Sequence, residues 1–144
     1  MEGRFTLTDF INNNMGKVVR KTYTFSGQNG VVNIFNTSGF VRTEIVAIVN
    51  SSLSGTVGCT IDLGFTNDPD AMISGTAITS LTLHTVWLQR IPGGTIEPAS
   101  LIRDYVSNAN QNIVIDISGT INSGSIEFVC FYVPLSANAR VTPV

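Results

Sequence analysis

The side chains that could carry enzyme chemistry are few. The chain has a single histidine, His84, so a Ser-His-Asp or Cys-His device would have to use it. No serine or cysteine lies in a recognisable nucleophile setting. The ten acidic residues are scattered singly, which gives no basis for choosing a carboxylate pair of the glycosidase kind. We therefore expect no enzymatic activity and no catalytic residue, and we interpret His84 as a solvated or interface side chain.

Residues that could hold a metal ion or a cofactor are also few. Asp68 and Asp70 offer oxygen ligands, but their spacing lacks the glycine and the distal bidentate glutamate of a calcium loop. The segment Asn67-Asp68-Pro69-Asp70 is typical of a turn that needs no ion. Two isolated cysteines and one histidine are too few for a closed zinc site. We expect no metal and no cofactor.

The two cysteines lie in alternating apolar runs. Cys59 belongs to Val57-Cys59-Ile61-Leu63, and Cys130 belongs to Ile126-Phe128-Cys130-Tyr132. This pattern places both on strand faces that point inward, where a free cysteine behaves as a small hydrophobic residue. We predict two buried thiols rather than a disulfide or a metal pair.

Composition excludes several further classes of protein. Charged residues make up 12% of the 144-residue chain, about half the roughly 25% of an ordinary soluble protein. The net charge of −2 and the presence of only two lysines argue against nucleic-acid binding, which requires clustered cations. No run approaches the ~20 apolar residues of a membrane span, and the first residues lack the layout of a signal peptide. We expect a protein that binds neither nucleic acid nor membrane and is used without export.

From Lys17 onward, apolar residues recur with a period of two. Runs of this kind are separated by turn signals rich in glycine, asparagine and proline, with no amphipathic helix between them. The length suits one hydrophobic core. The pattern predicts one all-β domain, an antiparallel β-sandwich of jelly-roll type with about eight strands. The expected strands are 17–25, 31–35, 40–49, 57–65, 71–78, 81–87, 112–118 and 125–133, with a turn at 119–124.

Residues 1–16 differ from the rest of the chain. Their apolar side chains, Phe5, Leu7, Phe10 and Ile11, are irregularly spaced, and three asparagines precede Gly16. We divide the chain into an N-terminal arm, 1–16, and a β-sandwich domain, 17–144. The mean hydropathy of +0.26, reached with so few charges, implies that part of the nominal surface is covered. We therefore expect a homo-oligomer.

The C-terminal third carries a resemblance to a known group. The segments Asn112-Ile-Val-Ile-Asp-Ile117 and Gly124-Ser-Ile-Glu-Phe-Val-Cys-Phe-Tyr-Val-Pro-Leu-Ser136 flank a glycine-rich turn. This arrangement resembles small β-rich virion proteins of tailed bacteriophages, in which a strand ends in an aromatic residue, one further residue and Pro-Leu-Ser. The two long runs within 45–65 and the later Trp87 also fit, so the resemblance covers roughly residues 17–136.

The resemblance implies a non-enzymatic virion structural protein. The expected role is that of a capsid decoration, or cement, protein that binds the outside of a phage head and stabilises it. Such proteins are often trimers that clamp neighbouring capsid subunits, so the major capsid protein is the expected partner and a homotrimer the expected state. The expected location is the capsid surface, after synthesis in the host cytoplasm. No functional residue of the group is carried over.

The N-terminal arm is the predicted docking element, and alternatives to the decoration role remain open. The candidate partner-binding residues, which would pack on a neighbouring copy or on the capsid shell, are Arg4, Phe5, Leu7, Phe10 and Ile11. One alternative is another virion part, such as a tail or head-fibre module. A second is a carbohydrate-binding jelly roll, for which Trp87 is the only plausible stacking platform.

Overall fold

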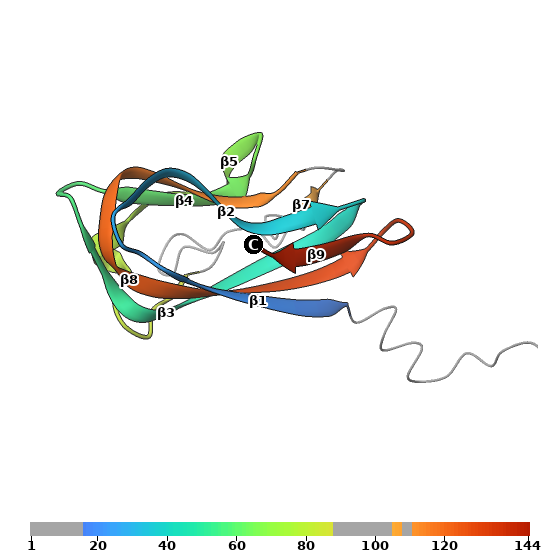
Figure 1. Ribbon diagram of the computed structural model, residues 1–144, viewed down its shortest axis with the longest axis horizontal. Helices are drawn as coiled ribbons and strands as arrows, with labels where there is room; N and C mark the ends of the chain where they lie inside the picture. Colours follow the sequence, from blue (N-terminus) through green and yellow to red (C-terminus); the bar gives the residue numbers. More distant parts are fainter. Residues whose placement is uncertain (1–15, 88–104, 108–110) are drawn as a thin grey trace, which may run out of the picture.

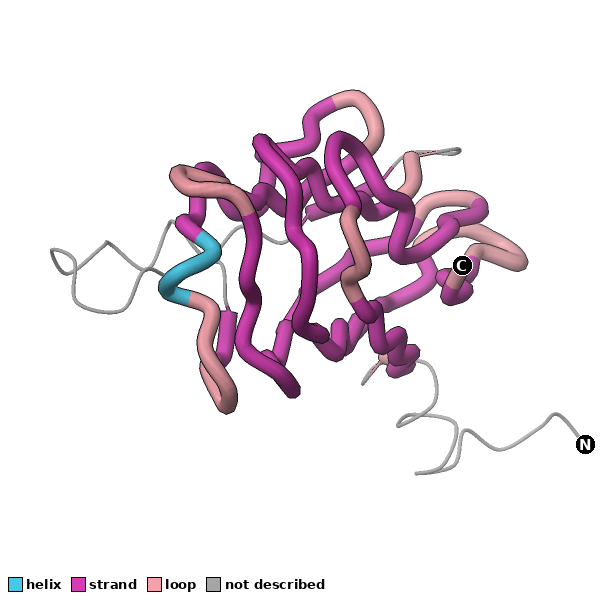
Figure 2. The backbone as a smooth tube through the Cα atoms, turned by 60° about the vertical axis from the view of Figure 1, so that its left-hand side comes forward, coloured by secondary structure: helices cyan, strands magenta, loops and turns pink. Residues whose placement is uncertain are grey.

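A computed structural model describes residues 16–87, 105–107 and 111–144. The described chain is almost entirely strand, with one helical turn (Figure 2). The all-β antiparallel class predicted from the sequence is confirmed. The elements are β1 Lys17–Thr24, β2 Gln28–Ser38, β3 Val41–Gly55, β4 Thr60–Phe65, β5 Asp68–Ala77, the 3₁₀ turn η1 Ile78–Ser80, β6 Val86–Trp87, β7 Tyr105–Ser107, β8 Ile113–Pro134 and β9 Arg140–Pro143.

The 22-residue strand β8 connects the two layers of the fold. Its first part pairs with β2 and β4, and its second part pairs with β1 and β3. One layer therefore has the order β5-β4-β8-β2-β9, whereas the other contains β1, β8 and β3 with the short strands β6 and β7 along β3. Figure 1 shows this single sheet folded over on itself, with β4 and β2 above β1 and β3. The arrangement is sandwich-like, but both layers belong to one continuous sheet.

The turn expected at 119–124 is wrong, because β8 continues through it. Ile121 in its middle is fully buried and pairs with Gln28 of β2 and Gly55 of β3. Gly119 and Gly124 adopt positive φ angles of 107° and 111°, which bend the strand without reversing it. The glycine-rich segment 119–124 is thus not a turn but two bends within one strand.

The core lies between the layers, and β3 shows the period of two that the sequence predicts for 40–49. Every second residue from Val41 to Val49 is at most 1% exposed. Trp87 is 5% exposed and meets Phe128 edge to face, with the ring centroids 6.5 Å apart. The Trp87 indole Nε1 donates a hydrogen bond of 2.9 Å to the Thr76 hydroxyl, which satisfies its one polar group.

Two predicted strands are shorter than expected. The run 57–65 becomes strand only at Thr60, because the Cys59 N–H donates to the Thr56 carbonyl (3.1 Å) and closes a turn. Val57 at the tip of this turn is fully exposed, not inward-facing. In the run 81–87, only β6 is strand. Leu83 is half exposed, and His84 has a φ of 70° in a turn rather than an extended conformation.

The first described strand, β1, begins at Lys17, and the division into an arm, 1–16, and a domain, 17–144, stays a prediction. Residues 1–15 of the arm lie outside the described residues, as does the loop around Pro92-Gly93-Gly94. The five predicted partner-binding residues therefore also lie outside the described part: Arg4, Phe5, Leu7, Phe10 and Ile11.

Candidate docking face

The residues considered for chemistry do not come together. His84 is exposed in its turn, where its backbone N–H donates to the Val49 carbonyl at 2.9 Å. Asp68 and Asp70 do meet, and a hydrogen bond between them is the main cause that raises the pKa of Asp68. Across residues 16–87, 105–107 and 111–144, no three histidine, cysteine or acidic side chains are placed to hold a metal ion.

Both cysteines are buried free thiols, as predicted. Cys59 is 3% exposed and Cys130 is fully buried. Burial raises the pKa of Cys130 to about 12. Burial also raises the pKa of Cys59, against a smaller opposing effect of its hydrogen bond with Thr56. Because the thiolate is the reactive form, neither group is suited to nucleophilic chemistry at neutral pH.

The most distinctive surface is the outer side of the layer formed by β1, β8 and β3, here called the outer face. Its central position is Val129 of β8, which is 4% exposed although it points away from the core. Four apolar side chains around it are between 44% and 56% exposed, and three more are half-buried. The outer face comprises the exposed Val18, Val86, Val106 and Phe131, the half-buried Val46, Ile48 and Val133, and Val129.

Strand register places these side chains in adjacent rows. Val18 of β1 lies opposite Phe131 of β8, which lies opposite Glu44 of β3. One row further, Val129 is flanked by Arg20 and Val46. Directly opposite residues in an antiparallel pair have their Cβ atoms about 4.5–5.5 Å apart, so apolar side chains of neighbouring strands lie in contact distance. Each row also contains one charged residue, Glu44 in the first row and Arg20 in the second.

The rows at the β3 edge extend this surface onto the two short strands. Val106 of β7 lies opposite Arg42, and Val86 of β6 lies opposite Ile48. Their inward neighbours, Ser107 and Trp87, are buried in the core. The alternation therefore continues across the whole layer, with one apolar side in the core and the other exposed.

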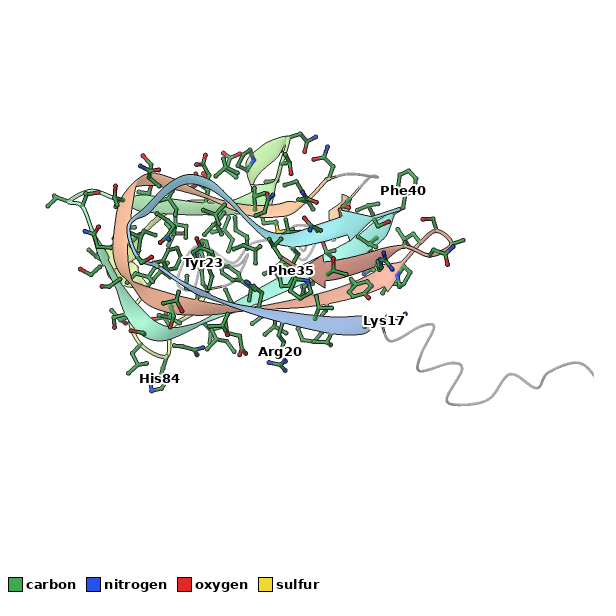
Figure 3. All side chains as sticks on the ribbon, in the orientation of Figure 1. Lys17, Arg20, Tyr23, Phe35, Phe40 and His84 are labelled. Atoms are coloured by element: carbon green, nitrogen blue, oxygen red, sulfur yellow. The ribbon has the colours of Figure 1, made fainter. Side chains whose placement is uncertain are left out.

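Charges on the outer face are few and balanced. Arg20 and Arg42 are matched by Glu44 and Glu127. The Arg20 Nη1 and Glu127 Oε1 atoms form an ion pair of 3.0 Å, and the Arg20 side chain points away from the body of the domain (Figure 3). With the Arg20 side chain 62% exposed, this pair adds little stability. The face has no net charge, so apolar burial is its main source of binding energy.

A broad apolar surface with few charges is suited to contact with another protein. Burying a half-exposed valine or phenylalanine removes apolar area from water at roughly 25 cal/mol per Å². The residues of this face include no nucleophile and no group of side chains placed to hold a metal ion. What this arrangement can do chemically is bind a flat, complementary surface.

Sequence reasoning missed this face because it counted only one side of each strand. The runs Ile45-Val-Ala-Ile-Val49 and Phe128-Val-Cys-Phe-Tyr-Val133 are apolar at consecutive positions. Continuous apolar runs are typical of strands that are covered on both sides. That signal was available and indicates a second buried face, which within one copy of the domain has no cover in the described structure.

The carbohydrate-binding alternative has lost its stacking platform. Trp87 is 5% exposed, packs on Phe128 and donates its indole hydrogen to Thr76. A stacking residue must present its ring face to a sugar, and this ring lies in the core.

Comparison with known proteins gave no match: no family model fits the chain, and no curated protein or solved structure is significantly similar to it.

Within the described residues, no helix is long and apolar enough to span a lipid bilayer.

Proposed function

We propose that this protein is a non-enzymatic structural subunit of a tailed-phage virion, a decoration protein that binds the outside of the head and stabilises the shell. The observation that carries the proposal is the outer face, which is rich in exposed apolar side chains and has no net charge, as suits a protein contact. The resemblance of residues 112–136 to small phage virion proteins supports the choice of a phage particle.

In this role the outer face packs against the major capsid protein or against a neighbouring copy. The exposed Phe131 and Val18 lie side by side near the centre of the face and are its natural anchors. Aromatic anchors surrounded by smaller apolar contacts commonly dominate the energy of an interface. The predicted arm residues would add contacts from the N-terminal side of β1.

Self-association is part of the same proposal. A face of this size exposed on a monomer would lower solubility, and the low fraction of charged residues offers no compensation. We expect the purified chain to sediment as a stable oligomer, with a trimer as the expected state. A monomer at micromolar concentration would contradict self-association, unless the oligomer assembles only on the shell.

The experiment that tests the function uses particles made without this protein. Purified chain is added back, unbound protein is removed on a gradient, and resistance of the heads to heat or chelation is measured. Wild-type chain should bind at a fixed number of copies per particle and raise head stability. Phe131→Ser should weaken binding at least about tenfold, which corresponds to roughly 1.4 kcal/mol.

Val57→Ser is the matched control, because Val57 is fully exposed in the turn between β3 and β4 and away from the outer face. It should bind as the wild type does. Equal binding by Phe131→Ser would contradict the outer face as the docking surface. Binding to tails or fibres rather than heads would favour a tail or head-fibre module instead.

A further inference from the structure

Within the described residues the strand β1 has a free edge, and its protection consists of charges alone, those of Lys17, Arg20 and Lys21. Within the described residues β1 pairs only with β8, over eight consecutive positions without a bulge, and contains neither proline nor glycine. Long regular edges of this kind attract further strands, and natural proteins usually blunt them. The other edges here are blunted: β5 contains Pro69, Gly75 and register shifts, β9 has four residues and ends at Pro143, and β6 and β7 have two and three residues.

The core is also incompletely covered beside this edge. The inward residues of β8 from Ile126 to Tyr132 are at most 7% exposed. The inward residues of neighbouring β1, Val19, Lys21 and Tyr23, are only half-buried. The Lys21 ammonium reaches across to the carbonyl oxygen of Val144. The cover of the core therefore stops at β1, as it would if one further strand belonged beside it.

The chain that precedes β1 has the composition of such a strand. Residues 5–11, Phe-Thr-Leu-Thr-Asp-Phe-Ile, are rich in aromatic and β-branched residues. They connect to β1 through Asn12-Asn13-Asn14-Met15-Gly16, a run of turn residues. Gly16 is described and has a φ of 76°. Three-residue hairpin loops typically end in a residue of this left-handed conformation, usually glycine.

We propose that the N-terminal arm of the same chain pairs antiparallel with the free edge of β1, with residues 14–16 as the hairpin loop. That loop fixes the register: Ile11 opposite Val19, Asp9 opposite Lys21, Leu7 opposite Tyr23. These three pairs share the inward face of β1, so two apolar side chains cover the half-buried residues and a carboxylate meets the lysine. Phe10, Thr8 and Thr6 fall on the outward side, next to the outer face.

Two other occupants of the edge are less favourable. In the registers of greatest overlap, two β1 strands related by a two-fold axis would place Arg20 against Arg20 or Lys21 against Lys21, and directly opposed like charges destabilise a pair. The arm of a second copy must bind from solution, whereas the chain's own arm is held beside the edge by a short loop at high effective concentration. The inference does not depend on the proposed virion role, because it concerns the isolated chain.

Hydrogen exchange on the unmodified full-length chain gives the first test. In an edge strand only alternate amides are bonded, so in β1 every second N–H should exchange fast if the edge is free. With the arm in place, amides on both sides of β1 should be protected, those facing the edge by roughly tenfold or more. Fast exchange of every second amide from Val18 to Tyr23 would overturn the proposal.

Cysteine cross-linking in the full chain tests the register. Thr8→Cys with Thr22→Cys joins directly opposite positions, and Thr22 is exposed, so the fold should tolerate the change. The matched control, Thr6→Cys with Thr22→Cys, is shifted by two residues, and its Cβ atoms would be about 7–8 Å apart, too far for an unstrained disulfide. The first pair should oxidise at least about tenfold faster than the control and run as a monomer on a non-reducing gel. Equal rates would refute the register, and covalent dimers would show that the arm comes from a second copy.

Discussion

Two phenylalanines on β8, three positions apart, should respond in opposite ways to truncation. Phe128 is fully buried and meets Trp87 edge to face, whereas Phe131 is 44% exposed on the outer face. Phe128→Ala removes a core side chain and leaves a cavity, a change that costs about 3–5 kcal/mol in proteins generally. In the monomer, Phe131→Ala should change the free energy of unfolding by about 0.5 kcal/mol or less, as exposed substitutions usually do. In an oligomer held by the outer face, its loss would appear in addition as a lower, concentration-dependent midpoint.

The assay is equilibrium urea denaturation of both variants and the wild type, followed by far-ultraviolet circular dichroism. The slope of the free energy against urea should be unchanged, so that the shift in midpoint reports stability. In the binding assay the order should reverse: Phe131→Ala loses affinity, while folded Phe128→Ala keeps it. An equal loss of stability in the two variants would refute the assignment of faces, because a slip of one residue exchanges the two sides of a strand.

Three further predictions concern particular residues. Cys59 and Cys130 should resist alkylation in folded protein and react after denaturation, because both are buried and burial raises their pKa values; rapid labelling by mass spectrometry would contradict this. Gly124→Ala should lower the free energy of unfolding more than Gly27→Ala does in urea titrations. Both glycines have a positive φ, which costs about 1–2 kcal/mol for alanine. Only a Cβ added at Gly124 would meet other atoms, Leu53 Cδ2 at 2.6 Å and Ser52 O at 2.7 Å. Asp70→Ala should lower the pKa of Asp68 in a carboxyl NMR titration, because it removes the hydrogen bond that favours protonated Asp68. The raised pKa of Asp68 stabilises the folded state at low pH, and this stabilisation is lost as the pH rises through that pKa. The stability of the variant should therefore depend less on pH, and an unchanged titration would contradict the pairing.

Much of the fold could be predicted from alternation alone. Alternation predicts a strand over 40–49 and places Cys59 in the core, because Gly58 and Thr60 on either side of it are small or polar. Cys130 lies between the apolar Val129 and Phe131, so its predicted inward position rests on the period of two in the run 126–132, and its burial confirms it. The sequence does not decide whether Trp87 lies in the core or is exposed as a stacking platform, because a lone aromatic residue in a short run is compatible with either. Its indole partner, Thr76 of β5, lies 11 residues earlier on another strand.

The errors arose at glycines and at strand ends. Gly119 and Gly124 have the sequence appearance of a hairpin turn, but the pairing of Ile121 with two other strands keeps β8 extended between them. By residue type Val57 continues the alternation of β4, but β4 begins only at Thr60, after Gly58 with its φ of 78°. At Ile121 long-range pairing decides, which local sequence does not encode, whereas at Val57 a local turn closed by the Cys59 N–H and the Thr56 carbonyl ends the strand.

The outer face was missed for a different reason. Only one side of β3 and β8 was counted, although a strand that is apolar on both sides needs two covers. The predicted docking residues of the arm stay a prediction, because they lie outside the described residues.

A cryo-electron microscopy reconstruction of particles that contain this protein tests the central claim most directly. The account predicts density for the nine-stranded domain on the outside of the head, with β1, β8 and β3 turned toward a protein neighbour and Phe131 in the contact. It would be contradicted if the domain were absent from the particle, or present with this layer facing solvent and a different surface in contact.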